Sequence, residues 1–328
     1  MIAYTAGNAK LWSKLGSRGV FGGIAIAELL QMRDDVFLLP ADVASSAGLN
    51  RVREQHPDRV FSMGIAEQNA IGVAAGLAKE GKIPFVMSFA PFISQRCADQ
   101  IRLCCGYMAM PIKIVALASG LSMGINGPSH LGYEDMAHLR AIPNMMIFSP
   151  ADCTETIKTV FSAVECPSPV YIRLTGELNN PPVYTEDYNF TPGKAVILRE
   201  GGAVTIMATG PMVHASLKAA ELLAAQGVKS TVMDVHTVRP LDVSAVRSQP
   251  RAKLMVTVEE HSLVGGLGSA VAECLASGGS HPPLLRLGLN PAEGYPHADT
   301  YPNLLARCGL TPEGISQSVL SALQEGAL

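Results

Sequence analysis

The chain of 328 residues is long enough for two domains, each with a hydrophobic core of its own. Hydrophobic residues make up 48% of it and charged residues 16%, a balance that excludes disordered and low-complexity scaffolds. The 25 Lys and Arg against 28 Asp and Glu leave a net charge of −3, with no extended basic run, so nucleic acid is not an expected partner.

Several global features concern assembly and location. The low charge of an apolar chain predicts an oligomer, because protein interfaces are depleted in charged residues. Seven scattered cysteines indicate reduced thiols rather than a disulfide framework, and no Cys or His spacing matches a metal site. The chain begins without the apolar core of a signal peptide and offers no membrane span of about 18 apolar residues. We therefore expect a soluble, cytoplasmic protein with no membrane association.

Apolar runs alternate with helical patterns along the first half of the chain. The pattern predicts helices at 20–36, 65–80, 94–107 and 154–164, and short buried strands at 37–42, 83–89, 112–119, 145–150 and 169–174. Strands that are apolar throughout and alternate with helices are typical of a parallel sheet covered on both faces. The first half is therefore expected to form an α/β domain.

Residues 178–195 interrupt this alternation with paired prolines, paired asparagines and no regular period, as a linker does. Alternation then resumes, with strands predicted at 203–210, 230–235 and 254–260 and helices at 214–227, after the Gly-rich turn at 264–268, and at 311–324. We therefore expect a parallel-sheet domain over residues 1–185 and a smaller α/β domain over residues 186–328.

The segment FSMGIAEQN (61–69) contains the most informative candidate residue, Glu67. This glutamate lies in the first turn of an Ala- and Gly-rich helix, and nothing nearby in the sequence neutralises it. A glutamate at that place commonly does no more than interact with the helix dipole. Alternatively, a carboxyl group presented from a helix start into an apolar site can share a proton with a ligand nitrogen. The residues alone leave both interpretations open.

Two Gly-rich segments follow predicted strands. The loop that leaves the strand 112–119 ends at His130 and lies where open α/β sheets bind ligands, and its glycines let the backbone approach a ligand closely. An isolated histidine is nevertheless more often structural than catalytic. The second segment, VGGLG (264–268), could form a phosphate-binding turn, but close packing of helix on strand explains a single GGxG better.

In order and spacing, a set of motifs resembles the pyrimidine-binding domain of the thiamine diphosphate-dependent transketolases. They are FSMGIAEQN (61–69), FAPF (89–92) with ADQIR (98–102), GLSMGINGPSH (120–130), RAIPNM (140–145), SPAD (149–152) and PVYIR (169–173). Residues 203–328 resemble the transketolase C-terminal domain, above all in AVTIMATGPMVHASLKAAELL and VHTVRPLD. The resemblance covers almost the whole chain and is greatest to the C-terminal half of transketolase encoded as a separate subunit.

This resemblance implies a partner chain. In the family a separate domain with a Gly-Asp-Gly motif holds the diphosphate and its divalent metal, and this sequence contains no Gly-Asp-Gly. The implied partner is an alpha-type subunit that holds thiamine diphosphate and Mg²⁺. The implied assembly is an α2β2 heterotetramer, active only when both chains are present.

The resemblance also implies cofactor-binding roles for individual residues. Glu67 matches the family glutamate that hydrogen-bonds the aminopyrimidine ring of the cofactor and acts as an acid/base. Phe89 and Phe92 match aromatic residues that stack on that ring, and Gln95 replaces a further stacking tyrosine. Asp42 matches an aspartate near the cofactor, although an ordinary turn or helix cap would also explain it.

On the substrate side some family residues are kept and others are replaced. Arg18 and Ser46 match residues that bind sugar phosphate, and His130 matches a histidine that contacts the substrate hydroxyls and carbonyl, so we expect His130 to act with Glu67 in catalysis. Asn126 stands where the family has an aspartate, although its amide can still contact substrate. Two further departures are Ala118 in place of a histidine and a residue near Gly176 in place of an arginine that binds acceptor phosphate.

The implied function is transfer of a two-carbon ketol unit from a ketose to an aldehyde, with a non-standard sugar as substrate. Two alternatives remain. One is the beta subunit of a 2-oxoacid decarboxylating synthase or dehydrogenase, which uses the same cofactor. The other is a homologue that has lost catalysis, which the substitutions at Ala118 and Asn126 would favour and the retained Glu67 would oppose.

Overall fold

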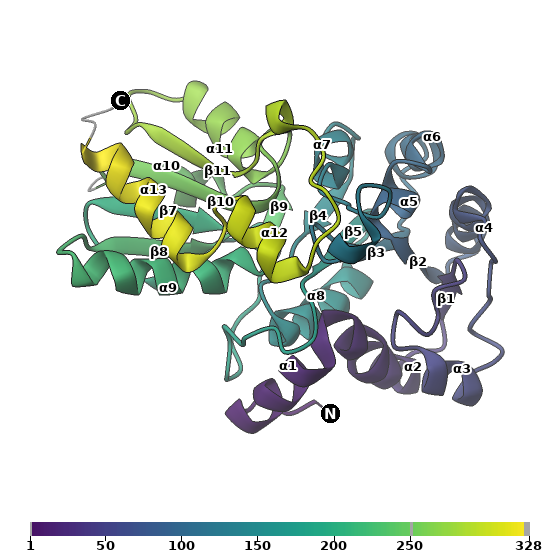
Figure 1. Ribbon diagram of the computed structural model, residues 1–328. Helices are drawn as coiled ribbons and strands as arrows, with labels where there is room; N and C mark the ends of the chain where they lie inside the picture. Colours follow the sequence, from purple (N-terminus) through teal and green to yellow (C-terminus); the bar gives the residue numbers. More distant parts are fainter. Residues whose placement is uncertain (1, 250–251, 325–328) are drawn as a thin grey trace.

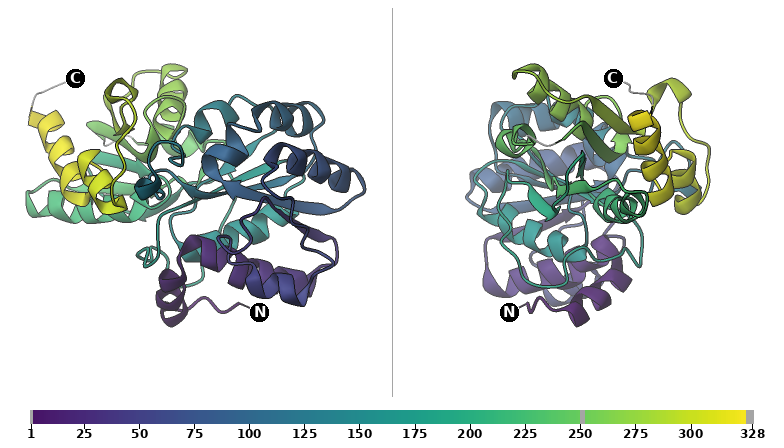
Figure 2. Two further views of the ribbon diagram at one scale, coloured as in Figure 1. Left: turned by 45° about the vertical axis from the view of Figure 1, so that its right-hand side comes forward. Right: turned by 90° about the vertical axis from the view of Figure 1, so that its left-hand side faces the viewer.

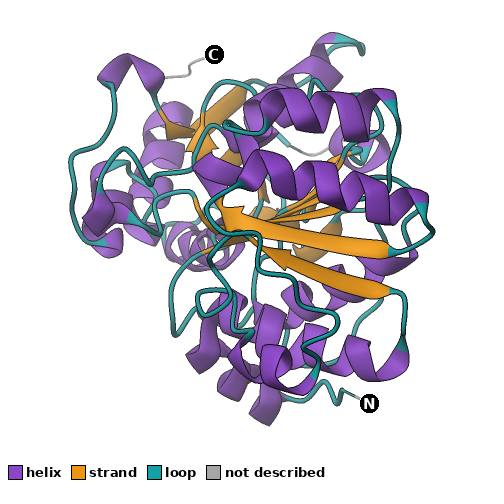
Figure 3. Ribbon diagram, turned by 90° about the vertical axis from the view of Figure 1, so that its right-hand side faces the viewer, coloured by secondary structure: helices purple, strands orange, loops and turns teal. Residues whose placement is uncertain are grey.

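The structure, a computed structural model, describes residues 2–249 and 252–324 and contains two β-sheets, each covered by helices on both faces (Figures 1 and 3). The six-stranded sheet has the order β1-β2-β3-β5-β4-β9 and the five-stranded sheet the order β11-β10-β7-β8-β6. Figure 2 shows the two units packed beside each other, the first purple to teal and the second green to yellow. The predicted α/β class is confirmed.

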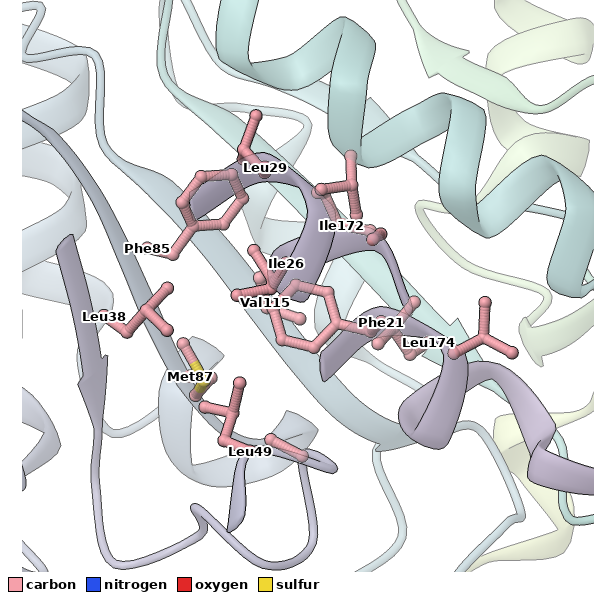
Figure 4. Close-up of a cluster of buried hydrophobic side chains, with 14 of the residues drawn as sticks. Phe21, Ile26, Leu29, Leu38, Leu49, Phe85, Met87, Val115, Ile172 and Leu174 are labelled. Carbon is pink, nitrogen blue, oxygen red and sulfur yellow. The ribbon is translucent and has the colours of Figure 1, made fainter. Parts of the chain in front are cut away.

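The first sheet is built from strands with apolar residues on both faces, and neighbouring residues of one strand therefore enter different cores. Its strands are β1 (Val36–Pro40), β2 (Ile83–Phe89), β3 (Lys113–Ser119), β4 (Met146–Phe148), β5 (Val170–Thr175) and β9 (Thr237–Arg239). In β2, Phe85 and Met87 pack on one face and Val86 on the other. Figure 4 shows the core that contains Phe85 and Met87. All strand pairs in this sheet are parallel except β4 with β9.

Two groups of helices cover the first sheet. On the face of Phe85 lie α1 (Ala6–Val20), the π-helix η1 (Phe21–Ile26), α2 (Ala27–Met32) and α8 (Cys153–Glu165). On the face of Val86 lie α4 (Glu67–Lys79), α5 (Ala90–Ser94), α6 (Ala98–Ile101), the π-helix η2 (Arg102–Tyr107) and α7 (Asp135–Leu139). The short helix α3 (Asn50–Gln55) and the 3-10 turn η3 (Gly124–Asn126) lie in connections.

The second sheet also has a core of apolar residues and covering helices on each face. Its strands are β6 (Val196–Arg199), β7 (Val204–Ala208), β8 (Ser230–Asp234), β10 (Leu254–Ser262) and β11 (Leu284–Leu289). Helices α9 (Met212–Ala225), α12 (Tyr301–Arg307) and α13 (Pro312–Gln324) contribute to the core on one face, and α10 (Val243–Arg247) and α11 (Leu267–Ala276) to the core on the other. The 3-10 turn η4 (Pro291–Glu293) follows β11.

Some predicted elements differ from the observed ones. The helical segment predicted at 20–36 starts at Ala6, passes through a π-helix and ends at Met32, before the predicted limit. The helix predicted at 94–107 is interrupted at 95–97, and α6 then continues directly into the π-helix η2. The prediction missed β6, β9 and β11. Of these, β9 joins the first sheet antiparallel to β4, so a segment beyond the linker completes the sheet of the first domain.

The linker 178–195 contains no helix or strand and ties the two units together through buried acids. Its Tyr184 hydroxyl donates to Asp234 Oδ2 of β8 at 2.7 Å, and its Tyr188 hydroxyl donates to Glu155 Oε1 of α8 at 2.6 Å. Burial raises the pKa of Asp234 to about 7. Burial and the neighbouring Asp234 carboxyl raise the pKa of Glu155 well above its usual range. The folded protein therefore retains protons here that the unfolded chain releases.

The variant Asp234→Asn tests this proton retention, because it places a neutral side chain of the same shape in the cluster. Folding raises the pKa of Asp234 in the wild type to about 7. The free energy of unfolding therefore decreases as the pH rises from about 4 through about 7, because the unfolded chain releases this proton first. We expect the melting temperature of the Asn variant to fall less than that of the wild type between about pH 5 and pH 8. Asp34→Asn, at a fully exposed carboxylate, is the control. Equal slopes for D234N and wild type would contradict the assignment.

Candidate active site

Glu67 is placed at the carboxyl edge of the first sheet by the segment that precedes it. The Phe61 N–H donates to the Leu38 carbonyl at 2.8 Å and the Met63 N–H to the Pro40 carbonyl at 2.9 Å, so this segment runs along β1. Gly64, with φ of 65°, then turns the chain, and α4 begins at Glu67. The first turn of α4 therefore lies beside the end of β2.

The Glu67 carboxylate is only 2% exposed and has a donor on each oxygen. The Ser88 hydroxyl of β2 donates to Oε1 at 3.0 Å, and Arg96 Nη1 donates to Oε2 at 2.9 Å. The fold therefore supplies the counter-ion for Glu67 that its neighbours in the sequence do not. The counter-ion comes from 29 residues further along the chain, where a pattern of neighbouring residues gives no sign of it.

A cluster of aromatic rings contacts this ion pair through Phe92. Phe89 at the end of β2 and Phe92 of α5 meet edge to face with centroids 6.4 Å apart. The His130 ring lies 5.3 Å from Phe92 and 6.4 Å from Phe89. The Arg96 guanidinium carbon lies 4.5 Å from the centre of the Phe92 ring. These contacts bring together Glu67, Phe89, Phe92 and His130, four residues predicted for the site, although no contact tests their roles.

The loop that carries Asn126 and His130 is closed at its base. The backbones of Gly120 and Gly132 exchange two hydrogen bonds, of 2.7 and 3.0 Å. Gly120 has φ of 68°, and a Cβ there would lie 2.2 Å from Glu260 Oε1, so its small size is required by close packing against β10. Asn126 is exposed in η3, and His130 Nδ1 lies 3.0 Å from the Ser129 hydroxyl.

A second group of predicted residues lies at the same edge of the sheet. Asp42, exposed and with φ of 58°, and Ser46 belong to the loop after β1. Arg18 lies in the last turn of α1. Its backbone is close to the loop after β1, because a Cβ built on Gly48 of that loop would lie 3.1 Å from the Arg18 carbonyl oxygen. Within residues 2–249 and 252–324, no hydrogen bond, ion pair or ring contact joins Asp42, Ser46 or Arg18 to Glu67.

A cavity of about 430 Å³ adjoins the aromatic cluster. It is lined by Phe92, Gln95, Arg96, Ser129 and Glu134, among others. Gln95 Nε2 donates to Glu134 Oε2 at 3.3 Å, so an amide with a carboxylate partner stands where the family resemblance implied a stacking ring. The lining therefore combines aromatic and polar side chains, the combination that binding sites for small polar ligands use.

One of the noted substitutions, at Gly176, has a local structural explanation, and Ala118 has none in the structure. Gly176 has φ of +88°, and a Cβ there would lie 3.1 Å from Asn180 Nδ2, so any side chain at this turn would be strained. Ala118 is fully buried with φ of 51° at the irregularity where β3 pairs with β5. Their influence on substrate choice stays a prediction.

Other candidate features lie outside this site. At the GGxG turn, the Glu259 carboxyl group accepts the N–H groups of Leu267 and Gly268 at 2.6 and 2.7 Å, so these two donors at the start of α11 are already occupied. The described residues contain no group of three His, Cys, Asp or Glu that could hold a metal ion. No helix in the described part of the chain is both long and apolar enough to span a membrane.

Comparison with known proteins identifies the family. The family "Transketolase, pyrimidine binding domain" matches residues 19–181, and "Transketolase, C-terminal domain" matches residues 193–315. The chain is 42% identical over 294 residues to a 6-deoxy-6-sulfo-D-fructose transketolase subunit of Clostridium sp. (strain MSTE9), a match that covers 88% of this chain and 89% of that protein. The chain belongs to the transketolase family.

Two further similarities involve separately encoded chains. An apulose-4-phosphate transketolase subunit of Actinobacillus succinogenes is 34% identical, over 88% of this chain and 94% of that protein. A solved structure described as a split gene transketolase, inactive beta4 tetramer, superposes with a TM-score of 0.82 at 38% identity, covering 94% of this chain and 98% of that one. The resemblance to separate beta-type transketolase subunits is thereby confirmed.

Transketolases depend on thiamine diphosphate, and the residues of this site fit its aminopyrimidine ring. A carboxylate held by a buried hydroxyl offers an acceptor for a ring nitrogen, and two aromatic side chains offer faces for a flat ring. Sequence reasoning missed two residues of this arrangement. Ser88 was detectable as the polar residue in the apolar strand IPFVMSF, whereas Arg96 was not.

Proposed function

We propose that this chain is the beta-type subunit of a thiamine diphosphate-dependent transketolase that moves a two-carbon ketol unit from a ketose to an aldehyde in the cytoplasm. One observation carries the proposal: a buried glutamate, Glu67, presented beside Phe89 and Phe92 at the carboxyl edge of a parallel sheet. We assign residues 1–185 to the pyrimidine-binding domain and residues 186–328 to the C-terminal domain.

The cofactor, when bound, supplies the carbanion chemistry that breaks and forms the carbon–carbon bond. Glu67 would hold and exchange a proton with an aminopyrimidine nitrogen through Oε2, while Ser88 fixes Oε1. Phe89 and Phe92 would orient the ring, and the burial of Glu67 would exclude water from the contact between its carboxyl group and the ring.

The remaining residues would complete the cofactor and substrate sites from the neighbouring loops. Asp42 and Gln95 would lie near the cofactor. His130 would contact the substrate carbonyl and hydroxyls, and Asn126 would contact a hydroxyl. Arg18 and Ser46 would bind a terminal anionic group, since Arg is suited to bidentate contacts with phosphate or sulfonate.

The diphosphate and Mg²⁺ would be held by an alpha-type partner. The lack of Gly-Asp-Gly in this sequence supports this assignment. It is also supported by the solved relative at 38% identity, whose tetramer of beta chains is described as inactive. We assign an α2β2 heterotetramer as the active assembly.

Reconstitution tests the proposed function. We expect the isolated chain to bind thiamine diphosphate weakly and to show no ketol transfer, and the mixture with the alpha-type chain to form α2β2 and to become active. Calorimetry, light scattering and a coupled ketol-transfer assay measure the three properties. Tight Mg²⁺-dependent cofactor binding by this chain alone would contradict the split site. Release of carbon dioxide from a 2-oxoacid would favour a decarboxylating enzyme instead.

Glu67→Gln tests the proton-sharing role. The amide can still accept from Ser88 but cannot exchange a proton, so turnover of the assembled enzyme should fall by about 100-fold or more. The fold should remain intact, and excess cofactor should restore activity only partly. Glu80→Gln, at the exposed C-terminal end of the same helix, is the matched control. Near-normal turnover of E67Q with normal melting would leave Glu67 as a helix-dipole residue only.

The residues that replace family substrate-binding residues indicate the substrate class. The chain lacks the family arginine near Gly176 that would bind acceptor phosphate, where a side chain would be strained, and Asn126 carries no charge. The relative at 42% identity is named for a sulfonated fructose and another for apulose 4-phosphate. We therefore assign a sulfonated or branched sugar as a substrate of this enzyme.

Steady-state kinetics of the reconstituted pair test the substrate class. We expect kcat/KM for xylulose 5-phosphate and ribose 5-phosphate to lie at least about tenfold below that for 6-deoxy-6-sulfofructose or apulose 4-phosphate, because a missing charged contact is worth about a factor of ten or more. Equal or higher efficiency with the ordinary pentose phosphates would show that the substitutions are neutral.

A further inference from the structure

Arg96 makes the two contacts that Glu67 and Phe92 would otherwise offer to a ligand. Its Nη1 donates to Glu67 Oε2 at 2.9 Å, and its Cζ lies 4.5 Å from the centre of the Phe92 ring. A guanidinium is planar and carries N–H donors at its edge, as the edge of an aminopyrimidine does. Glu67 Oε2 and the face of Phe92 therefore cannot bind Arg96 and a ligand ring at the same time.

We propose that Arg96 is a placeholder: it occupies the aminopyrimidine subsite in the cofactor-free subunit and is displaced when thiamine diphosphate binds. This inference rests on the proposed function, in which Glu67 and Phe92 receive that ring. Before assembly the guanidinium neutralises a carboxylate that is 2% exposed and would otherwise be a buried unpaired charge. On cofactor binding the ring takes over the Oε2 contact.

The surroundings of Arg96 allow such a displacement. Its side chain is 45% exposed and lies in the connection between α5 and α6, so it can rotate outward without disturbing a helix. Ser88, by contrast, is buried in β2 and stays in place. The cavity of about 430 Å³ beside Arg96 is also lined by Glu134, which offers the displaced guanidinium a new carboxylate.

If Arg96 leaves the subsite free in only a fraction of the molecules, the apparent affinity for the cofactor is reduced by that fraction. A half-exposed ion pair is a weak competitor, so the expected penalty is about three- to tenfold in the cofactor Kd. Removing the guanidinium should therefore tighten cofactor binding by that factor. A merely structural arginine would, on removal, leave the Kd unchanged or make binding weaker.

The first arm of the test uses the complete cofactor-free chain. Urea unfolding is measured for wild type, Arg96→Gln, Glu67→Gln and the double variant. We expect R96Q to lower the unfolding midpoint in the wild-type background and to have a smaller effect in the E67Q background, because the ion pair is already lost there. Equal effects in both backgrounds would overturn the pairing on which the placeholder depends.

The second arm measures binding of thiamine diphosphate with Mg²⁺ to the assembled pair by calorimetry. We expect R96Q to tighten the Kd about three- to tenfold, and Arg96→Lys, which keeps the charge but not the planar group, to have an intermediate effect. The control is Arg102→Gln, at an exposed arginine paired with Asp99, and it should leave the Kd unchanged.

The outcomes separate the two proposals. If the wild-type pair binds no thiamine diphosphate, the proposed function fails. If the wild-type pair binds it and R96Q binds with equal or weaker affinity, the placeholder alone is overturned. Tighter binding by R96Q but not by R102Q supports the placeholder.

Discussion

One buried guanidinium, that of Arg173 in β5, joins the site loop and α7 to strand β10 of the second sheet. The side chain is 1% exposed, and its Nε lies 3.0 Å from both carboxylate oxygens of Asp135 in α7. Its Nη2 donates to the carbonyls of Gly132 and Glu260 at 3.2 and 2.8 Å. A charge this deeply buried is costly to leave unpaired, so Arg173 fixes the end of the site loop, α7 and β10 relative to one another.

The C-terminal domain consequently shapes a site whose predicted residues all lie in the first domain. The Glu260 carboxylate accepts the Leu121 N–H at 2.6 Å and the Tyr301 hydroxyl at 2.6 Å. The first bond holds the start of the loop at Gly120, where there is no space for a side chain, and the second joins α12 to the same carboxylate. Because the loop is anchored at both ends, the position of His130 against the Phe92 ring depends on contacts far from it in the sequence.

The sequence predicts those features of the fold that come from local composition. Strands β2, β3 and β5 are buried on both faces, so each appears as a mainly apolar run, interrupted by Ser88 in β2 and Arg173 in β5. Their predicted limits lie within one residue of those observed. Strand β9 has three residues and pairs only because the chain returns to the first sheet after the linker, which no local pattern contains. The π-helices η1 and η2 continue the apolar pattern of the α-helices next to them, so the sequence predicts helix at both places but not the π form.

The candidate site also depends on a contact between segments that are distant in the sequence. Glu67 is conspicuous in sequence because of its place in a helix start, but its counter-ion comes from a segment that meets α4 only in the folded chain. The two partners of the carboxylate differ in kind. Ser88 is buried on a strand and permanent, whereas Arg96 is half exposed on a connection and removable. The Glu67 carboxylate must be paired before the cofactor binds, and its Oε2 must be free afterwards. It therefore needs one permanent partner, Ser88, and one that can be displaced, Arg96.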